Sequence, residues 1–127
     1  MSAEKKTILI VEDERNLRAY YEQELTAAGY YVIGVGGGME AVEVVARERV
    51  DLVILDIGMP DMDGLEAMRK MLDKNRKLPI ILNTAYEAFK DDFMSWAAEA
   101  YILKSADPTE LLQAIASTLE RAAGREA

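Results

Sequence analysis

A run of four aliphatic residues that ends in an acid constrains the fold of this chain more than any other feature. Residues 52–55 read Leu-Val-Ile-Leu, Asp56 follows directly, and Gly58 and Pro60 then disfavour regular structure. An unalternating apolar run of this length, bounded by turn residues, indicates a strand buried on both faces of a sheet. Asp56 would lie at the carboxyl end of that strand, the edge at which open α/β sheets bind ligands. Asp56 is therefore a candidate for chemistry.

The rest of the chain alternates between short apolar segments and helical patterns. Five alternations with short connections favour a single α/β domain, in which a parallel sheet is covered by helices on both faces. The segment at 30–35 is less uniformly apolar than the others and is expected to form an edge strand. Strands are predicted at residues 7–11, 30–35, 52–55, 78–82 and 101–103, and helices at 15–28, 39–49, 65–72, 88–97 and from 108 to about 119.

Local signals mark where several helices begin and end. Gly29 follows the first helical pattern and is expected to stop it. Asp63 and Glu66, three residues apart, fit a capping box for the third helix. Asp107 is expected to cap the last helix, with Pro108 in its first turn.

Three further local predictions concern residues with weaker signals. The run at 36–38 consists of three glycines but lacks the spacing and the lysine of phosphate-binding loops, so a flexible connection is expected. Residues 122–127 are expected to form a tail or the stump of a linker, outside a core of about 7–121. The inward face of the helix at 39–49 is predicted to consist of Ala41, Val42, Val45 and Ala46.

Composition excludes several classes of function. The 127 residues are enough for one domain with a real core, and their formal charge of −8 disfavours binding to nucleic acid or to an anionic membrane. No membrane span and no leader are recognised, so a cytoplasmic protein is expected. The absence of cysteine and histidine excludes thiol catalysis, a histidine base and the usual zinc ligands.

Polar side chains follow four of the predicted strands. Glu12 and Asp13 follow the first, Asp56 the third, Thr84 the fourth and Lys104 the fifth. Right-handed crossovers bring the carboxyl ends of parallel strands to one edge, so these side chains are expected to converge. Two unit charges about 4 Å apart repel by about 4 kcal/mol at an effective dielectric of 20, so three carboxylates require a cation. Oxygen ligands of this kind suit Mg²⁺.

Together these residues resemble the receiver domain of two-component response regulators of the chemotaxis-regulator type. The resemblance covers residues 8 to about 119, and its motifs occur in the family's order and spacing. It implies a flavodoxin-like doubly wound fold with five helices and strand order 2-1-3-4-5. The motifs are Ile-Leu-Ile-Val-Glu-Asp at 8–13, Asp-Leu-Val-Ile-Leu-Asp-Ile-Gly-Met-Pro-Asp-Met-Asp-Gly at 51–64, Pro-Ile-Ile-Leu-Asn-Thr-Ala at 79–85 and Tyr-Ile-Leu-Lys at 101–104.

The resemblance implies a role for each residue of the site. Asp56 would accept a phosphoryl group from a phosphohistidine, while Lys104 and Thr84 would contact the phosphoryl oxygens. As Thr84 moves toward that group, Tyr101 would turn inward and change the surface of the fourth helix, fifth strand and fifth helix. The implied Mg²⁺ ligands are Glu12, Asp13, Asp56 and the backbone carbonyl of Gly58.

The sequence departs from the family pattern at two positions near the site. Ser105 replaces the usual proline after the lysine, which leaves open whether the Lys104–Ser105 peptide is cis. Asn83 stands where the family more often has an apolar residue, and its side chain could bond the loop backbone or reach the site. Gly58 and Tyr86 occupy positions that tune the lifetime of the phosphoryl group in this family.

The implied partners are a sensor histidine kinase or phosphotransfer protein and an unidentified output partner or domain. A homodimer through the fourth helix, fifth strand and fifth helix is left open. Two other functions are alternatives to a phosphorylated receiver. A pseudo-receiver that only binds proteins would normally lack one of the site residues, and none is missing. A phosphatase with an aspartyl nucleophile would want a second acid where Gly58 stands, so turnover of an external substrate is not expected.

Overall fold

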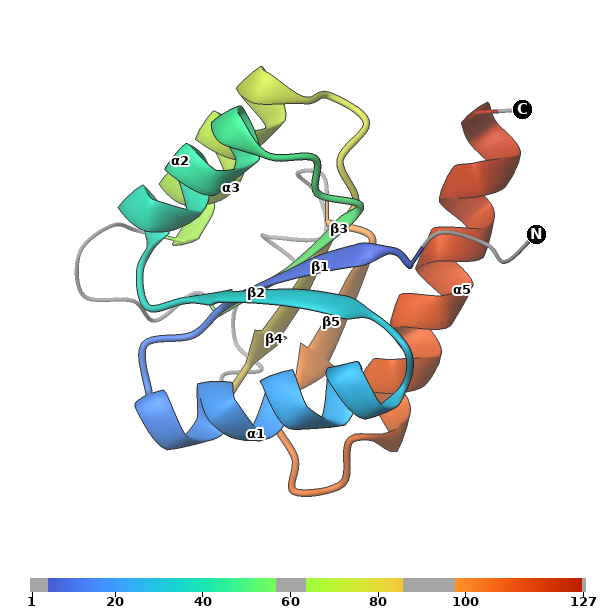
Figure 1. Ribbon diagram of the computed structural model, residues 1–127. Coiled ribbons are helices and arrows are strands. Elements are labelled where there is room, and N and C mark those ends of the chain that lie inside the picture. Colours follow the sequence, from blue (N-terminus) through green and yellow to red (C-terminus); the bar gives the residue numbers. More distant parts are fainter. Residues whose placement is uncertain (1–4, 57–63, 86–97, 127) are drawn as a thin grey trace.

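The computed structural model describes residues 5–56, 64–85 and 98–126 of the chain. Five strands form one parallel sheet with the order β2-β1-β3-β4-β5 (Figure 1). This confirms the predicted sheet and its strand order, and it places β2 at an edge as expected. The strands are β1 Thr7–Val11, β2 Tyr31–Val35, β3 Leu52–Leu55, β4 Ile80–Thr84 and β5 Ala100–Leu103.

The described helices cover both faces of the sheet. Helices α2 and α3 pack on one face, and α1 and α5 pack on the other (Figure 1). The helix predicted at 88–97 lies outside the described residues. The described helices are α1 Arg15–Ala27, α2 Gly38–Arg47, α3 Gly64–Lys74 and α5 Thr109–Glu126.

The central strand β3 contributes to both halves of the core. Val53 and Leu55 pack with the residues of α2 and α3, whereas Leu52 and Ile54 pack with those of α1 and α5. All four side chains are at most 2% exposed. Successive side chains of a strand point to opposite faces, so a strand with helices on both sides must be apolar at every position. This is the physical origin of the unalternating run in the sequence.

Side chains and glycine define the helix ends near the sheet edge. The Glu14 carboxylate caps α1 by accepting hydrogen bonds from the amides of Asn16, at 3.1 Å, and Leu17, at 2.9 Å. Gly29 has a φ of 101°, a left-handed conformation that glycine adopts without a steric penalty, so it ends α1 as predicted. The proposed capping residue Asp63 of α3 lies outside the described residues.

Helices α2 and α5 differ from the predictions. Ala46 is exposed, and Val44 is the buried residue of that turn, so the predicted inward face of α2 is wrong at this position. A shift of one residue turns a helix by about 100°, so a pattern of consecutive apolar residues leaves its inward face ambiguous. Residues 122–126, predicted as a tail, continue α5 to Glu126.

Candidate functional site

The sheet brings two buried acids together at its carboxyl edge. Glu12 directly follows β1 and is 2% exposed, and Asp56 directly follows β3 and is 6% exposed. Their backbones extend the sheet, because the Glu12 amide donates to Val35 O and the Asp56 amide to Val11 O, both at 3.0 Å. Asp13 is exposed beside them. One carboxylate oxygen from each of the three acids lies within 4.8 Å of the others, so the predicted convergence of the acids is present.

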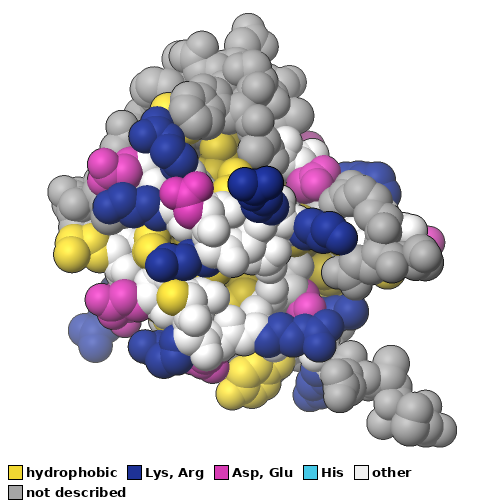
Figure 2. All heavy atoms as spheres, turned by 90° about the horizontal axis from the view of Figure 1, so that it is seen from above, with side chains coloured by type: hydrophobic (Ala, Val, Ile, Leu, Met, Phe, Trp, Pro, Cys, Tyr) yellow, Lys and Arg dark blue, Asp and Glu magenta, His cyan; other side chains and the backbone are white. Residues whose placement is uncertain are grey.

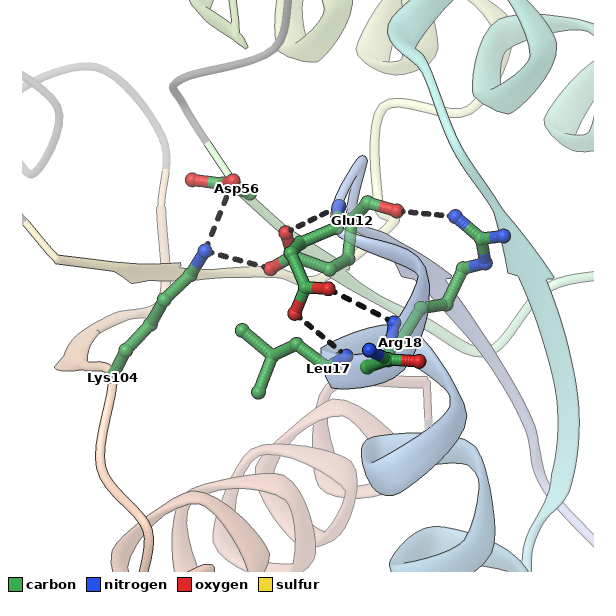
Figure 3. Close-up of polar contacts among 7 residues, drawn as sticks. Glu12, Leu17, Arg18, Asp56 and Lys104 are labelled. Carbon is green, nitrogen blue, oxygen red and sulfur yellow. Dashed lines mark hydrogen bonds and ion pairs between the residues drawn. The ribbon is translucent and has the colours of Figure 1, made fainter.

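Lys104 reaches this cluster from the end of β5. Its ammonium nitrogen lies 2.7 Å from Oε1 of Glu12 and 3.1 Å from Oδ2 of Asp56 (Figure 3). The backbone amide of Lys104 donates to the carbonyl of Thr84 at 2.8 Å, which continues the pairing of β5 with β4 past the end of the strand. The pairing of the edge strand β5 with β4 therefore brings the lysine to the acids.

Burial and pairing act on the pKa values of the site in opposite directions. Burial raises the pKa of Glu12 above its ordinary value, although the hydrogen bond from Lys104 and the one from the Glu14 amide partly offset this. For Lys104, burial alone lowers the pKa, but the bond to Glu12 and the charge of Asp56 outweigh burial, and the pKa is raised. Lys104 is therefore held as a cation by the acids that it contacts.

The donor set of the cluster fits a hard divalent cation. Glu12, Asp13 and Asp56 offer carboxylate oxygens only, and a single ammonium does not balance three carboxylates. Mg²⁺ prefers oxygen ligands and is commonly held by one or two carboxylates together with water and phosphate. The fourth predicted ligand, the carbonyl of Gly58, lies outside the described residues.

The two predicted switch residues occupy neighbouring strands on one face of the sheet. Thr84 ends β4 and is fully buried, and Tyr101 is half-buried against the core formed with α2 and α3. Tyr101 pairs with Leu82, two residues before Thr84, and residues two apart on a strand share a face. Thr84 and Tyr101 therefore lie near each other, as the switch hypothesis requires.

The two departures from the family pattern have clear structural outcomes. None of the peptide bonds in the described part of the chain is cis, so the Lys104–Ser105 bond is trans. Asn83 is 3% exposed and lines a cavity of about 310 Å³ between β5 and the start of α5. Within the described residues, no hydrogen bond joins its side chain to the loop backbone or to the acids. Tyr86, like Gly58, lies outside the described residues.

One contact of the site was not predicted from the sequence. A guanidinium nitrogen of Arg18, in the second turn of α1, donates to the backbone carbonyl of Glu12 at 2.7 Å (Figure 3). No motif marks this arginine, because a side-chain bond to a carbonyl six residues earlier leaves no periodic pattern. Gly34 and Gly36 could have indicated such a contact, because a glycine in a strand often marks the close approach of another group.

Fold and site together define a class of protein. A doubly wound sheet of order 2-1-3-4-5, with acids after strands one and three and a lysine after strand five, is the architecture of an aspartate-based phosphosignalling switch. The family model of the response regulator receiver domain matches residues 8–116. The chain therefore belongs to the response regulator receiver domain family, whose members are signalling switches rather than enzymes that turn over a substrate.

Curated relatives are longer than this chain. A protein named "Probable transcriptional regulator ycf27" from Porphyridium aerugineum is 37% identical over 120 residues, which are 93% of this chain and 50% of the relative. The response regulator MprA of Mycobacterium leprae is 36% identical over 116 residues, 90% of this chain and 51% of the relative. The chain thus spans about half the length of the curated relatives that it matches.

Solved structures of receiver domains superpose closely on the chain. The response regulator TrrA of Thermotoga maritima, in complex with Mg²⁺ and BeF, has a TM-score of 0.84 and 39% identity, and the match covers 89% of this chain and 98% of TrrA. TrrA was also solved in complex with the histidine kinase ThkA. That match has a TM-score of 0.83 and the same identity, and it covers 90% of this chain and 98% of TrrA. A CheY-like receiver domain from Methanospirillum hungatei has a TM-score of 0.90 at 28% identity, and the match covers 96% of this chain and 99% of that domain.

Proposed function

We propose that Asp56 accepts a phosphoryl group from a phosphohistidine of a sensor kinase, with Mg²⁺ held by Glu12, Asp13, Asp56 and the carbonyl of Gly58. The observation that carries this proposal is the placement of Lys104 between Glu12 and Asp56, with all three acids within reach of one ion. The structures of TrrA with Mg²⁺ and BeF and with the kinase ThkA support it by similarity.

The residues of the chain suit the chemistry of phosphoryl transfer. An oxygen of the Asp56 carboxylate would attack phosphorus as the bond from phosphorus to the histidine nitrogen breaks, and the electron pair of that bond stays with the imidazole. A carboxylate attacks as the anion and has no proton to lose, so the step needs no separate base. Mg²⁺ would supply positive charge to the phosphoryl oxygens. Lys104 would contact one of these oxygens and Thr84 would donate its hydroxyl to another.

The signal would leave the site through β4 and β5. Once Thr84 moves toward the phosphoryl group, Tyr101 would turn inward into the space that is vacated. The affected surface comprises β5, α5 and the region of the predicted fourth helix, and on β5 it includes Leu103, which is 41% exposed. This surface would contact the output partner or domain, or a second copy of the chain in a homodimer.

Direct binding to nucleic acid and to membranes is not part of the proposal. Figure 2 shows lysine and arginine side chains interspersed with acids rather than gathered in one patch on the face that it presents. Among the described helices, none is both long and apolar enough to cross a membrane. We propose a cytoplasmic location, where a kinase and an output partner would both be accessible.

Phosphorylation in vitro tests the central claim. Incubation with MgCl₂ and acetyl phosphate should add the mass of one phosphoryl group, and Asp56→Asn should abolish the addition. Asp73→Asn, which changes an exposed acid on α3, serves as the control and should behave like the parent. A folded parent that gains no mass would indicate the alternative function, a pseudo-receiver that binds proteins without being phosphorylated. Retained modification at position 56 of the Asp56→Asn protein would contradict the assignment.

A further inference from the structure

The peptide that joins Glu12 to Asp13 is held from outside the acidic cluster. A guanidinium nitrogen of Arg18 donates to the Glu12 carbonyl at 2.7 Å, and the Glu12 amide on the other side of the residue donates to Val35 of β2 at 3.0 Å. A peptide unit is planar, so the direction of the Glu12 carbonyl also sets the direction of the Asp13 amide. One arginine thus restrains the backbone that carries two of the three acids.

Two glycines of the edge strand region make room for this arginine. A Cβ atom added at Gly36 would lie 3.2 Å from the Arg18 nitrogen that bonds Glu12. A Cβ at Gly34 would lie 2.7 to 2.9 Å from the carboxyl atoms of Glu22, closer than such contacts normally come. Glu22 in turn lies 4.0 Å from Nε of Arg18, one helical turn earlier in α1. Glycine weakens a strand, and its presence often marks a close approach by another group. Here the approaching groups are Arg18 and Glu22.

From this geometry we infer that Arg18 is a positioning residue for the metal site: it fixes the Glu12–Asp13 peptide so that the carboxylates of both residues converge with Asp56. The inference rests on the proposed Mg²⁺ binding. It also gives the glycines a specific role, since Gly34 and Gly36 let the Arg18–Glu22 pair lie against β2. The connection after β2 therefore leaves space for the Arg18 side chain, in addition to linking β2 to α2.

A charge effect and a positioning effect of Arg18 predict opposite results. If the arginine acted only through its positive charge, its removal would strengthen Mg²⁺ binding, because one repulsive cation near the site would be lost. If it positions the loop, its removal should weaken Mg²⁺ binding. Partners of metal ligands outside the first coordination shell typically change affinity by about 10- to 100-fold when they are mutated. The sign of the change therefore identifies the mechanism.

Calorimetric titration of the full chain with MgCl₂ measures that sign. We expect Arg18→Met to weaken binding about tenfold relative to the parent. Arg15→Met removes the same charge from an exposed position in the first turn of α1 and should leave the affinity unchanged or slightly higher. Circular dichroism would establish that both variants are folded. An Arg18→Met protein that binds Mg²⁺ as tightly as the parent, or more tightly, overturns the inference while leaving the proposed function intact.

A double-mutant cycle tests whether Gly36 makes room for Arg18. Gly36→Ala should crowd Arg18 and weaken Mg²⁺ binding in the parent, but it should have little further effect in the Arg18→Met background, because residues that act through one contact are not additive. Additive effects of the two substitutions on Mg²⁺ binding would refute this role of Gly36.

A measurement on the metal-free protein keeps the inference testable even if the parent fails to bind Mg²⁺. Heteronuclear NOE values at the Asp13 amide should fall in Arg18→Met and stay unchanged in Arg15→Met. Equal values in all three proteins would overturn the positioning role, whereas a parent that does not bind Mg²⁺ would count against the proposed function alone.

Discussion

The ammonium of Lys104 makes its shortest ion pair, 2.7 Å, with Glu12 rather than with the proposed phosphoacceptor. Its contact with Asp56 is longer, at 3.1 Å. Lys104 is thus the counterion of a carboxylate that is also a proposed metal ligand. Binding of a dication and binding of the lysine are therefore competing ways to neutralise the same acids.

This competition predicts opposite effects of Lys104→Met on stability and on metal affinity. The metal-free variant should lose about 1–3 kcal/mol of its unfolding free energy, since hydrogen bonds to charged groups contribute on that scale. Its affinity for Mg²⁺ should rise, because a like charge is removed from the site. Urea unfolding and calorimetry measure the two effects, with Lys70→Met on the exposed face of α3 as the control. A lower Mg²⁺ affinity in Lys104→Met would show that the lysine supports the metal site instead.

Mg²⁺ should raise the melting temperature of the parent, and Asp13→Ala should remove most of the increase. A ligand that binds only the folded state stabilises it by about 2.7 kcal/mol at 100 times its dissociation constant. Asp13 is the exposed acid of the cluster, so its removal takes away a ligand without opening the core. Asp73→Ala, on α3, should keep the full increase. Equal midpoints of the parent with and without Mg²⁺, by thermal unfolding, would refute the metal site.

Asn83→Val should stabilise the protein. Asn83 is 3% exposed and lines the cavity between β5 and the start of α5, while Ile81 and Ile102 beside it are apolar. A valine suits the strand better than an asparagine and is apolar like its neighbours, for an expected gain of about 1 kcal/mol in urea unfolding. Asn83→Asp, which keeps the shape but adds charge, should destabilise. A loss of stability in Asn83→Val would mean that the amide makes useful contacts with water in the cavity.

Asp107 should make the stability of the protein depend on pH in acid. Hydrogen bonds from the hydroxyl and amide of Thr109 hold the pKa of Asp107 below its ordinary value of 3.8. The stabilisation is therefore present above pH 3.8 and is lost as the pH falls through the lower pKa of the folded state. Asp107→Ala should lower the melting temperature near pH 7, and the gap from the parent should narrow in acid. Asp107→Asn should lower the melting temperature at pH 7 less than Asp107→Ala does, because asparagine can still cap a helix.

The strands and the acids could be predicted from the sequence because each has a local signal. The predicted bounds of β1 and β3 match the structure, and Glu12, Asp13, Asp56 and Lys104 converge as expected. Strand β4 begins and ends two residues later than predicted. Its last residues, Asn83 and Thr84, are polar, and they are strand residues because they pair with β5, which is a long-range contact that no local pattern encodes.

Other features depend on tertiary packing, which a local sequence pattern does not encode. The buried position of Val44 in place of Ala46 follows from the rotation of α2 on the sheet. Residues 122–127, which include Gly124, were predicted to be a tail or a linker stump, so the end of α5 was placed too early. A glycine inside a helix costs only about 1 kcal/mol, and here the helix continues past it. The roles of Thr84 and Tyr101 remain predictions, since they concern a change between two states.

Helix α5 has a practical consequence for experiments on this protein. It starts just after the β5 end that carries Lys104 and runs for 18 residues, so its last turn lies about 27 Å farther along its axis, away from the acids (Figure 1). A fluorophore, an affinity handle or a fused reporter attached at the end of α5 would therefore leave the approach of a bulky phosphodonor unobstructed. The end of α5 is the preferred anchoring point for surface-immobilised kinetics.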